Sequence, residues 1–255
     1  MGRLDNRVAL LTGGAKGIGR HYAQALAANG ARLMIADISD SKELAESIAR
    51  ERGANSVASS VTDVSDEGAV KKLVAQTIER FGKIDILVNN AALYAPLAEQ
   101  RVTDIDTAVW DRVMAVNVRG VFLMTKYVAP HMIAQKYGKI INISSGTVAR
   151  GIPLFAHYVS SKGAVTAFTR AVSRELGEYN ICVNTLAPGF TLSDTVVNEN
   201  PGHIEHSRAP SIARRAIKRD EHPEDLLGAL VFLASADSDF ITGQTIAVDG
   251  GANNT

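Results

Sequence analysis

The chain has 255 residues, 46% of them hydrophobic and 21% charged, which is the composition of a soluble globular protein with a substantial core. Basic and acidic residues number 27 each, so no excess charge favours a nucleic acid or an anionic membrane as a partner. The lone cysteine, Cys182, excludes an intrachain disulfide and favours a reducing compartment. No apolar run approaches the roughly 20 residues that span a bilayer, and no signal-peptide pattern opens the chain. We therefore expect a cytoplasmic protein that does not bind membranes.

Short apolar runs alternate with longer helical patterns along the whole chain. Strands that alternate with helices pair in parallel through right-handed crossovers, so the pattern predicts an α/β fold with a parallel sheet covered on both faces. No repeat or linker divides the sequence, and we expect a single domain over residues 1–255. The expected strands are 7–11, 32–36, 56–61, 84–88, 139–143, 181–186 and 245–248, and the expected helices are 17–29, 41–52, 66–81, 106–135, one that passes through 158–162 and ends near 178, and 223–234.

Residues 190–219 interrupt this alternation. The segment is polar and lacks a long apolar period, which predicts a mobile flap after the sixth strand. His203, Glu205 and His206 have a spacing seen in metal sites, but solvated loop side chains are the expected state, so no metal is predicted. The basic side chains of the flap either contact an acidic substrate or are simply solvated. They are Arg208, Arg214, Arg215, Lys218 and Arg219.

The first strand leads into the glycine-rich sequence at 12–19, which opens a helix. Glycines permit a tight turn and let the backbone approach a pyrophosphate, whose oxygens meet the free N–H groups of the helix. Asp37 ends the second strand, where a carboxylate binds both hydroxyls of an adenosine ribose and repels a 2′-phosphate. NAD is therefore favoured over NADP, although Lys16 is a cation that would attract such a phosphate. The predicted cofactor residues here are Gly13, Lys16, Gly17, Ile18, Gly19, Asp37 and Ile38.

Tyr158 and Lys162 are one helical turn apart, so their side chains share a helix face. A free tyrosine has a pKa near ~10, which makes it a poor base at neutral pH. An ammonium at ~4 Å, with an effective dielectric of ~20, contributes roughly 4 kcal/mol, or about three pKa units. We therefore expect Lys162 to lower the Tyr158 pKa toward the range useful for general acid–base catalysis. Alone, such a pair is also typical of packing with solvated charge.

Taken together, these motifs resemble those of the short-chain dehydrogenase/reductase family of the classical NAD(P)-dependent type, over nearly the whole chain. The resemblance implies a Rossmann fold with seven parallel strands and, often, a homotetramer. It also implies that Asp63 and Val64 hold the adenine ring. The matching motifs are 12–19, Asn89-Asn90-Ala91, Asn117, Ser145, Tyr158 with Lys162, and Pro188-Gly189, and Asn90 and Ala91 are expected to border the cofactor ribose.

The resemblance implies four catalytic residues. Tyr158 exchanges a proton with the substrate oxygen while a hydride passes between the carbinol carbon and the nicotinamide. Lys162 lowers the Tyr158 pKa and reaches the nicotinamide ribose, and Ser145 stabilises charge on the substrate oxygen. Asn117 is expected to anchor a water chain that carries protons from Lys162. Simpler alternatives are that Ser145 caps a strand end and that Asn117 bonds backbone within its helix.

Two places depart from the family pattern. Ala92 stands where the family usually has glycine, and its methyl group is expected to narrow the space beside the cofactor. After Pro188-Gly189, Thr191 and Ser193 replace an apolar residue and a threonine. We expect the Thr191 backbone to meet the nicotinamide carboxamide and the Ser193 hydroxyl to substitute for that of threonine. Both are equally typical of flap residues without a ligand.

The substrate pocket is expected to be mostly apolar or aromatic, which suits a ring or an aliphatic secondary alcohol. We predict a NAD-dependent oxidoreductase that interconverts a secondary alcohol and a ketone. The alternatives are an NADP-dependent 3-oxoacyl-type ketoreductase and a non-catalytic NAD(H) sensor, against which the intact Ser145, Tyr158 and Lys162 argue. The predicted pocket residues are Leu93, Tyr94, Thr147, Val148, Phe155, the flap from Phe190 onward, and Arg150, which either binds an anionic group or is solvated.

Overall fold

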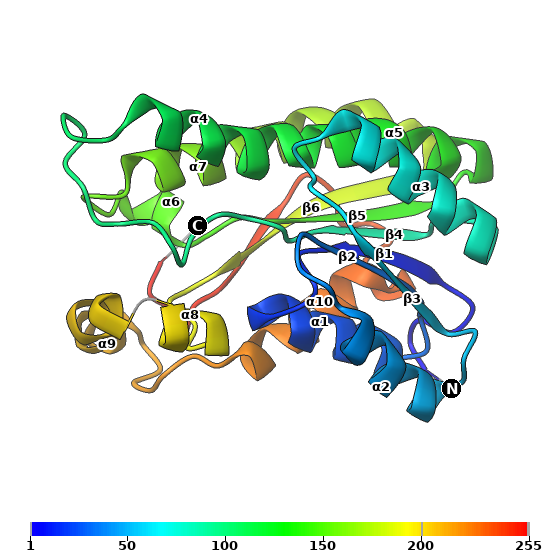
Figure 1. Cartoon of the computed structure of the whole chain (residues 1–255), viewed down its shortest axis with the longest axis horizontal. Coiled ribbons are helices and arrows are strands. Elements are labelled where there is room, and N and C mark those ends of the chain that lie inside the picture. Colours follow the sequence, from blue (N-terminus) through cyan, green and yellow to red (C-terminus); the bar gives the residue numbers. More distant parts are fainter. Residues whose placement is uncertain (1, 200, 254–255) are drawn as a thin grey trace.

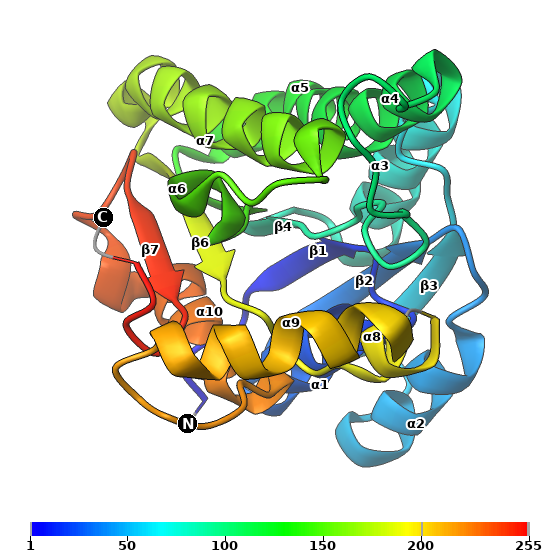
Figure 2. The same ribbon diagram turned by 90° about the vertical axis from the view of Figure 1, so that its left-hand side faces the viewer.

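The computed structural model describes residues 2–199 and 201–253 of the chain. Its centre is one sheet of seven strands, all parallel, in the order β3-β2-β1-β4-β5-β6-β7 (Figures 1 and 2). The predicted α/β Rossmann fold with a seven-stranded parallel sheet is confirmed. The strands are β1 (Val8–Thr12), β2 (Arg32–Asp37), β3 (Val57–Val61), β4 (Ile86–Asn89), β5 (Gly138–Ile143), β6 (Ile181–Pro188) and β7 (Thr245–Val248).

Helices cover both faces of the sheet (Figure 1). Along β1, Ala9 and Leu11 join one buried cluster while Val8 and Leu10 join the other, because successive side chains of a strand point to opposite faces. None of the described helices is long and apolar enough to cross a membrane. The helices α1 (Gly17–Ala28), α2 (Lys42–Arg52) and α10 (Pro223–Ala234) cover one face, and α3 (Glu67–Phe81), α4 (Thr107–Met114), α5 (Gly120–Gln135) and α7 (Ala156–Leu176) cover the other.

The strand order creates a crevice at the carboxyl ends of β1 and β4. The chain proceeds from β1 outward to β3, then returns to place β4 on the other side of β1. Connections from β1 and β4 therefore leave toward opposite faces, and ligands of open α/β sheets bind at such a point. The turn after β1 and the loop after β4 are tied together there, because Asn90 Nδ2 donates to the carbonyl of Gly13 at 2.7 Å.

The helical region predicted over 106–135 is helical, but it is not one regular helix. A π-helical turn, η1 (Ala115–Arg119), separates α4 from α5. Asn117 lies inside this turn and is fully buried. The wider turn carries its amide to two other elements rather than along its own helix, and π-turns of this kind occur often at functional sites.

The prediction of an irregular flap after β6 is wrong. Most of the segment forms two helices, α8 (Asp194–Glu199) and α9 (Pro201–Arg214), which lie across the carboxyl ends of the strands (Figure 2). Ser193 caps α8 by accepting the N–H of Val196 at 3.4 Å, and Pro201 suits the first position of a helix. These helices are mostly exposed, so they lack the apolar period that reveals packed helices. Asn200 and the His203 side chain lie outside the described residues.

Candidate active site

A cavity of 540 Å³ lies at the carboxyl edge of the sheet, within the size range of small-molecule and cofactor sites. Every residue predicted from the sequence to bind the cofactor borders it, and so do Ser145, Arg150 and the predicted pocket residues Leu93, Tyr94, Thr147, Phe155 and Phe190, but not Val148. Asn117 lies outside the cavity lining. Parts of the flap beyond Phe190 also border the cavity, as predicted, among them Thr195, Val196, Glu199 and Ser211, whereas Arg208 does not. Arg112 and Leu154 line the cavity as well, and sequence analysis did not single them out.

The glycine-rich turn forms a cradle that only glycine allows. Gly13 has φ +66°, and a Cβ there would lie 2.7 Å from the Cα of Ala91. A Cβ on Gly19 would lie 1.8 Å from the carbonyl oxygen of Gly13. Helix α1 starts at Gly17 without a side-chain cap from the described residues and without an acidic residue in its first turn. Its free N–H groups therefore suit the pyrophosphate of a dinucleotide.

Asp37 is buried at the end of β2 rather than solvated. Its Oδ2 accepts the N–H of Ala15 and its Oδ1 accepts the N–H of Ser39, both at 2.9 Å. Each carboxylate oxygen can accept a second hydrogen bond, so both stay available to a ribose hydroxyl. The nearby Lys16 ammonium is paired with the Glu199 carboxylate of α8, which opposes its charge.

The adenine end of the cavity contains an ion pair that sequence analysis missed. Burial would raise the pKa of Asp63, but hydrogen bonds from Ser65 and the guanidinium of Arg112, 3.0 Å away, bring it below its ordinary value. Ala92 is exposed, and its backbone is not in the left-handed region, so its methyl group fits without strain. Ala92 borders the cavity, and the narrowing of the space beside the cofactor stays a prediction.

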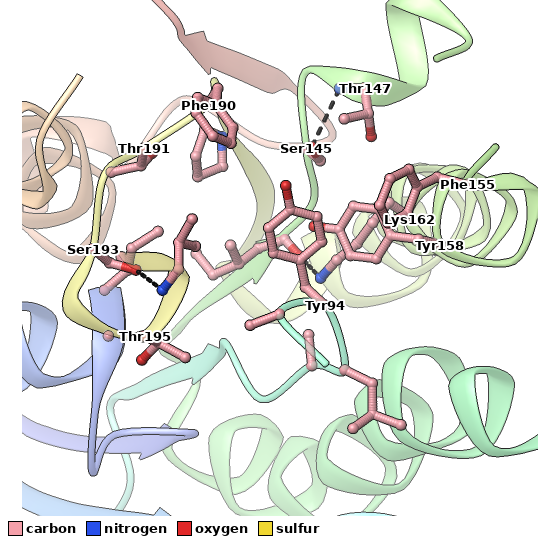
Figure 3. Close-up of a pocket in the computed structure, with 18 of the residues that line it drawn as sticks. Tyr94, Ser145, Thr147, Phe155, Tyr158, Lys162, Phe190, Thr191, Ser193 and Thr195 are labelled. Carbon is pink, nitrogen blue, oxygen red and sulfur yellow. Dashed lines mark hydrogen bonds between the residues drawn. The ribbon is translucent and has the colours of Figure 1, made fainter. Parts of the chain in front are cut away.

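Tyr158 and Lys162 lie together in α7, and both side chains are buried (Figure 3). The Lys162 Nζ donates to the carbonyl of Ile143 at 2.8 Å and lies 5.7 Å from the centre of the Tyr158 ring. Burial raises the pKa of Tyr158 to about 12, although the Ser145 hydroxyl acts to lower it. Burial also lowers the pKa of Lys162 to about 8.

The expected lowering of the Tyr158 pKa is therefore wrong for this structure. Removing a phenolate from water disfavours its charge, and here burial is the largest influence on the Tyr158 pKa. The ammonium also donates to the backbone carbonyl of Ile143, and its distance to the centre of the Tyr158 ring is 5.7 Å. Proximity was predictable from helical spacing, whereas desolvation depends on the tertiary structure.

Ser145 and the aromatic residues surround the Tyr158 hydroxyl (Figure 3). Ser145 Oγ accepts the N–H of Thr147 at 3.2 Å. The Tyr94 ring lies 4.8 Å from the Tyr158 ring and 6.1 Å from the Phe155 ring, and burial raises the pKa of Tyr94. This end of the cavity therefore combines an aromatic wall with the hydroxyl groups of Ser145 and Tyr158.

Asn117 connects three elements behind the cavity. Its Oδ1 accepts the N–H of Leu93 at 2.8 Å, and its Nδ2 donates to Leu93 O at 3.2 Å and to Ser161 Oγ at 3.0 Å. The alternative that it bonds backbone within its own helix is not what the structure shows. Asn117 holds the loop after β4 against α7 next to Lys162, and its role in a water chain stays a prediction.

A buried ion pair between Arg215 and Glu221, which no sequence motif marks, holds the flap side of the cavity. Glu221 Oε1 accepts the N–H of Gly189 at 3.1 Å and the hydroxyl of Thr191 at 2.7 Å. Glu221 Oε2 lies 3.2 Å from Arg215 Nη2, which also donates to the carbonyl of Phe190 at 2.7 Å. The Thr191 side chain is thus committed to Glu221, and the contact of its backbone with the nicotinamide carboxamide stays a prediction.

A family model described as "Enoyl-(Acyl carrier protein) reductase" matches residues 13–253. The chain is a short-chain dehydrogenase/reductase. It is 36% identical over 251 residues to the 3-oxoacyl-[acyl-carrier-protein] reductase FabG of Thermotoga maritima, covering 98% of both chains. It is 40% identical over 262 aligned positions to the galactitol 2-dehydrogenase of Agrobacterium fabrum, again covering 98% of both. The crystal structure of levodione reductase superposes with a TM-score of 0.90 at 32% identity, covering 97% of this chain and 98% of that one.

These short-chain dehydrogenase/reductases share a fold but carry names for different substrates. An acyl-carrier-protein thioester, a polyol and levodione appear among them. The chain is therefore an oxidoreductase of a family that binds a nicotinamide cofactor. Family membership leaves the substrate to be argued from the cavity.

Proposed function

We propose that this chain is a NAD-dependent oxidoreductase that interconverts a secondary alcohol and a ketone, with Tyr158 as general acid and base. The observation that carries the proposal is one cavity bordered by Asp37 at one end and by Ser145, Tyr158 and Lys162 at the other. Such an arrangement joins a dinucleotide cradle to a buried proton donor. The aromatic wall suits an apolar alcohol or ketone body.

NAD is favoured by the charges near the adenosine ribose. Asp37 is a buried carboxylate with free acceptor capacity, and a 2′-phosphate beside it would be repelled. Lys16, the cation that could offset this repulsion, is paired with Glu199. The N-terminus of α1 would hold the pyrophosphate, and Lys162 the hydroxyls of the nicotinamide ribose.

The proton chemistry follows from the pKa values of two buried groups. Tyr158, with a pKa of about 12, is protonated at neutral pH and can donate its proton to a ketone oxygen. Lys162, with a pKa of about 8, is mostly charged at neutral pH. When bound, an oxidised nicotinamide supplies the hydride acceptor and a positive charge that favours the phenolate during alcohol oxidation. Ser145 donates a hydrogen bond to the substrate oxygen and stabilises its developing charge.

A panel of secondary alcohols and ketones, followed by the absorbance of NADH, tests the proposal. Tyr158→Phe should keep NAD binding and lower turnover by about 10²- to 10⁴-fold, because the proton donor is lost. Tyr127→Phe is the control, since its hydroxyl bonds Glu67 away from the cavity, and turnover should be kept. Undiminished turnover in Tyr158→Phe would reject the role of Tyr158. Tight NADH binding without turnover of any panel member would favour the sensor alternative.

A 3-oxoacyl-type ketoreductase that uses NADP is the second candidate. The likeness to the Thermotoga maritima reductase over 98% of both chains favours it. Dissociation constants for NAD and NADP separate the two candidates, because Asp37 should make NADP the weaker ligand.

We also infer a cytoplasmic homotetramer from the family resemblance. Analytical ultracentrifugation tests the assembly, and a mass other than that of four chains would contradict it.

A further inference from the structure

The flap contains five basic residues, and most are already committed within the protein. Arg208 pairs with Asp220, at 2.6 Å, and Arg219 pairs with Asp225, also at 2.6 Å. Arg215 pairs with Glu221, as described above, and Lys218 donates to a backbone carbonyl. Arg214, the last residue of α9, borders the cavity and has no ion pair with a carboxylate among the described residues. It is therefore the flap cation that a ligand can reach.

A second arginine, Arg150, borders the same cavity. Arg150 ends the short helix α6 (Thr147–Arg150) and is half-buried. Its Nε is buried and finds no hydrogen-bond partner among the residues that the structure describes. Burial and then the charge of Arg214 lower the pKa of Arg150, which places the two guanidinium groups within electrostatic reach of each other. A buried charged N–H without an acceptor is costly, so this position is suited to a ligand oxygen.

Helix α6 offers a further unused donor next to Arg150. Thr147 and Arg150 are three residues apart, so their side chains share a helix face. The Thr147 hydroxyl is buried, borders the cavity and is likewise without a partner among the described residues (Figure 3). Two buried donors on one helix have no partner among the described residues, and a second cationic side chain, Arg214, borders the same cavity, so the three groups form an acceptor-binding site.

Nearby carboxylates do not occupy this site. Asp249 is buried, and its oxygens accept the N–H groups of Gly251 and Ala252, each at 3.0 Å, and the amide of Asn253. Glu99 also borders the cavity, and its charge contributes to the raised pKa of Tyr94. Its side chain is exposed, so water screens that charge. Within the described part of the chain, neither the Thr147 hydroxyl nor the Arg150 Nε has an acceptor, which leaves both donors to a substrate.

We propose that Thr147, Arg150 and Arg214 bind an anionic group of the substrate, a carboxylate or a phosphate ester, at the end of an apolar body that carries the reacting carbonyl. This inference rests on the proposed alcohol–ketone chemistry and names its substrate class. The aromatic wall of Tyr94 and Phe155 holds the apolar body beside Tyr158. A guanidinium matches the planar oxygens of a carboxylate, which fixes the orientation of the substrate.

The test compares one ketone with and without a charge. 4-Acetylbenzoate should be reduced with a kcat/KM about 10- to 100-fold above that of its neutral methyl ester, mostly through KM, because hydrogen bonds to a charged group contribute that much. 4-Acetylphenyl phosphate shows which of the two anions fits better. Arg150→Met and Arg214→Met should each reduce the preference for the anion about tenfold, and Arg150→Lys should restore part of it. Arg208→Met is the matched control on α9, because Arg208 does not border the cavity, and it should leave the preference unchanged.

Binding measured without turnover separates this inference from the proposed function. Calorimetry on Tyr158→Phe with NADH should show 4-acetylbenzoate binding more tightly than the ester, and Arg150→Met should remove the difference. NADH affinity reports whether Arg150→Met is folded. Equal binding of acid and ester, or a preference that survives both arginine substitutions, would overturn the anionic site. Failure of every ketone to be reduced, with the anion still bound, would overturn the reaction instead.

Discussion

At the scale of single residues, the chemistry depends on how burial and charge balance at Tyr158. Burial holds the phenol near a pKa of about 12 and the neighbouring ammonium near about 8. Both groups therefore carry their protons at neutral pH, which suits the proposed reduction of a ketone. Alcohol oxidation needs a phenolate, and only an additional positive charge close to the phenol favours it.

This balance predicts a titration that depends on the redox state of the cofactor. NAD, whose ring is positive, should lower the Tyr158 pKa by about one to three units, whereas NADH, whose ring is neutral, should lower it much less. The tyrosinate absorbance of the wild-type protein minus that of Tyr158→Phe, measured against pH, isolates this one phenol. The same titration curve with NAD and NADH would contradict the proposed placement of the ring beside Tyr158.

At the scale of elements, the buried pair of Arg215 and Glu221 joins the end of β6 to the segment that follows α9. The two side chains bind the backbone of Gly189 and Phe190 and the hydroxyl of Thr191. Since these residues border the catalytic end of the cavity, the pair positions the flap side of the site. Breaking a buried pair leaves an uncompensated charge in the interior.

Glu221→Gln should therefore lower the free energy of unfolding by about 3 to 5 kcal/mol, because Arg215 loses its partner. It should also weaken NADH binding more than ADP-ribose binding, since Glu221 holds Thr191 and ADP-ribose lacks the nicotinamide that the Thr191 backbone is expected to meet. Urea denaturation and calorimetry measure the two effects. Glu224→Gln removes an exposed carboxylate from the next helix and serves as control. Equal losses for NADH and ADP-ribose would show that the pair only stabilises the fold.

The N-terminus of α10 gives a prediction on pH and stability. Hydrogen bonds from Arg219, and then from the N–H of His222, lower the Asp225 pKa from 3.8 to about 2. A carboxyl whose pKa is lower in the folded state stabilises the fold above its unfolded pKa, and this stabilisation is lost as pH falls toward the folded pKa. Asp225→Asn should thus be about 0.5 to 2 kcal/mol less stable at pH 7. In urea denaturation this deficit should shrink between about pH 4 and 2, and a constant deficit would contradict the explanation.

A helix or strand is predictable from the sequence when one of its faces is buried, because burial requires apolar residues at regular intervals. The apolar run of β1 and the pattern of α10 are visible because their side chains are buried against neighbours. Helices α8 and α9 bury few side chains, so their sequence lacks the apolar period of a packed helix and predicts irregular structure instead. Asp37 and the Tyr158–Lys162 pair were found because a local motif marks them. Glu221 carries no motif, and its function comes from the contacts that distant segments make.

At the scale of the whole molecule, the location of the site follows from the topology of the sheet alone, because the strand order reverses beside β1. This reversal opens one crevice that brings Asp37, at the end of β2, and Tyr158, on α7 beyond β5, to the same cavity. A ligand that spans the cavity contacts both halves of the sheet. Its binding free energy therefore stabilises the entire fold against unfolding.

Thermal unfolding with and without nucleotide follows from this coupling. NAD at 100 times its dissociation constant should add about 2.7 kcal/mol of stability, which for a chain of this size raises Tm by about 5 to 10 °C. At the same concentration NADP should raise Tm less, because Asp37 repels the 2′-phosphate. Asp37→Asn should shrink the NAD shift and narrow the gap between the nucleotides, whereas Asp104→Asn, on an exposed loop outside the cavity, should change neither. Equal shifts with NAD and NADP in the wild-type protein would contradict the choice of NAD, and a gap that persists in Asp37→Asn would assign the discrimination to a residue other than Asp37.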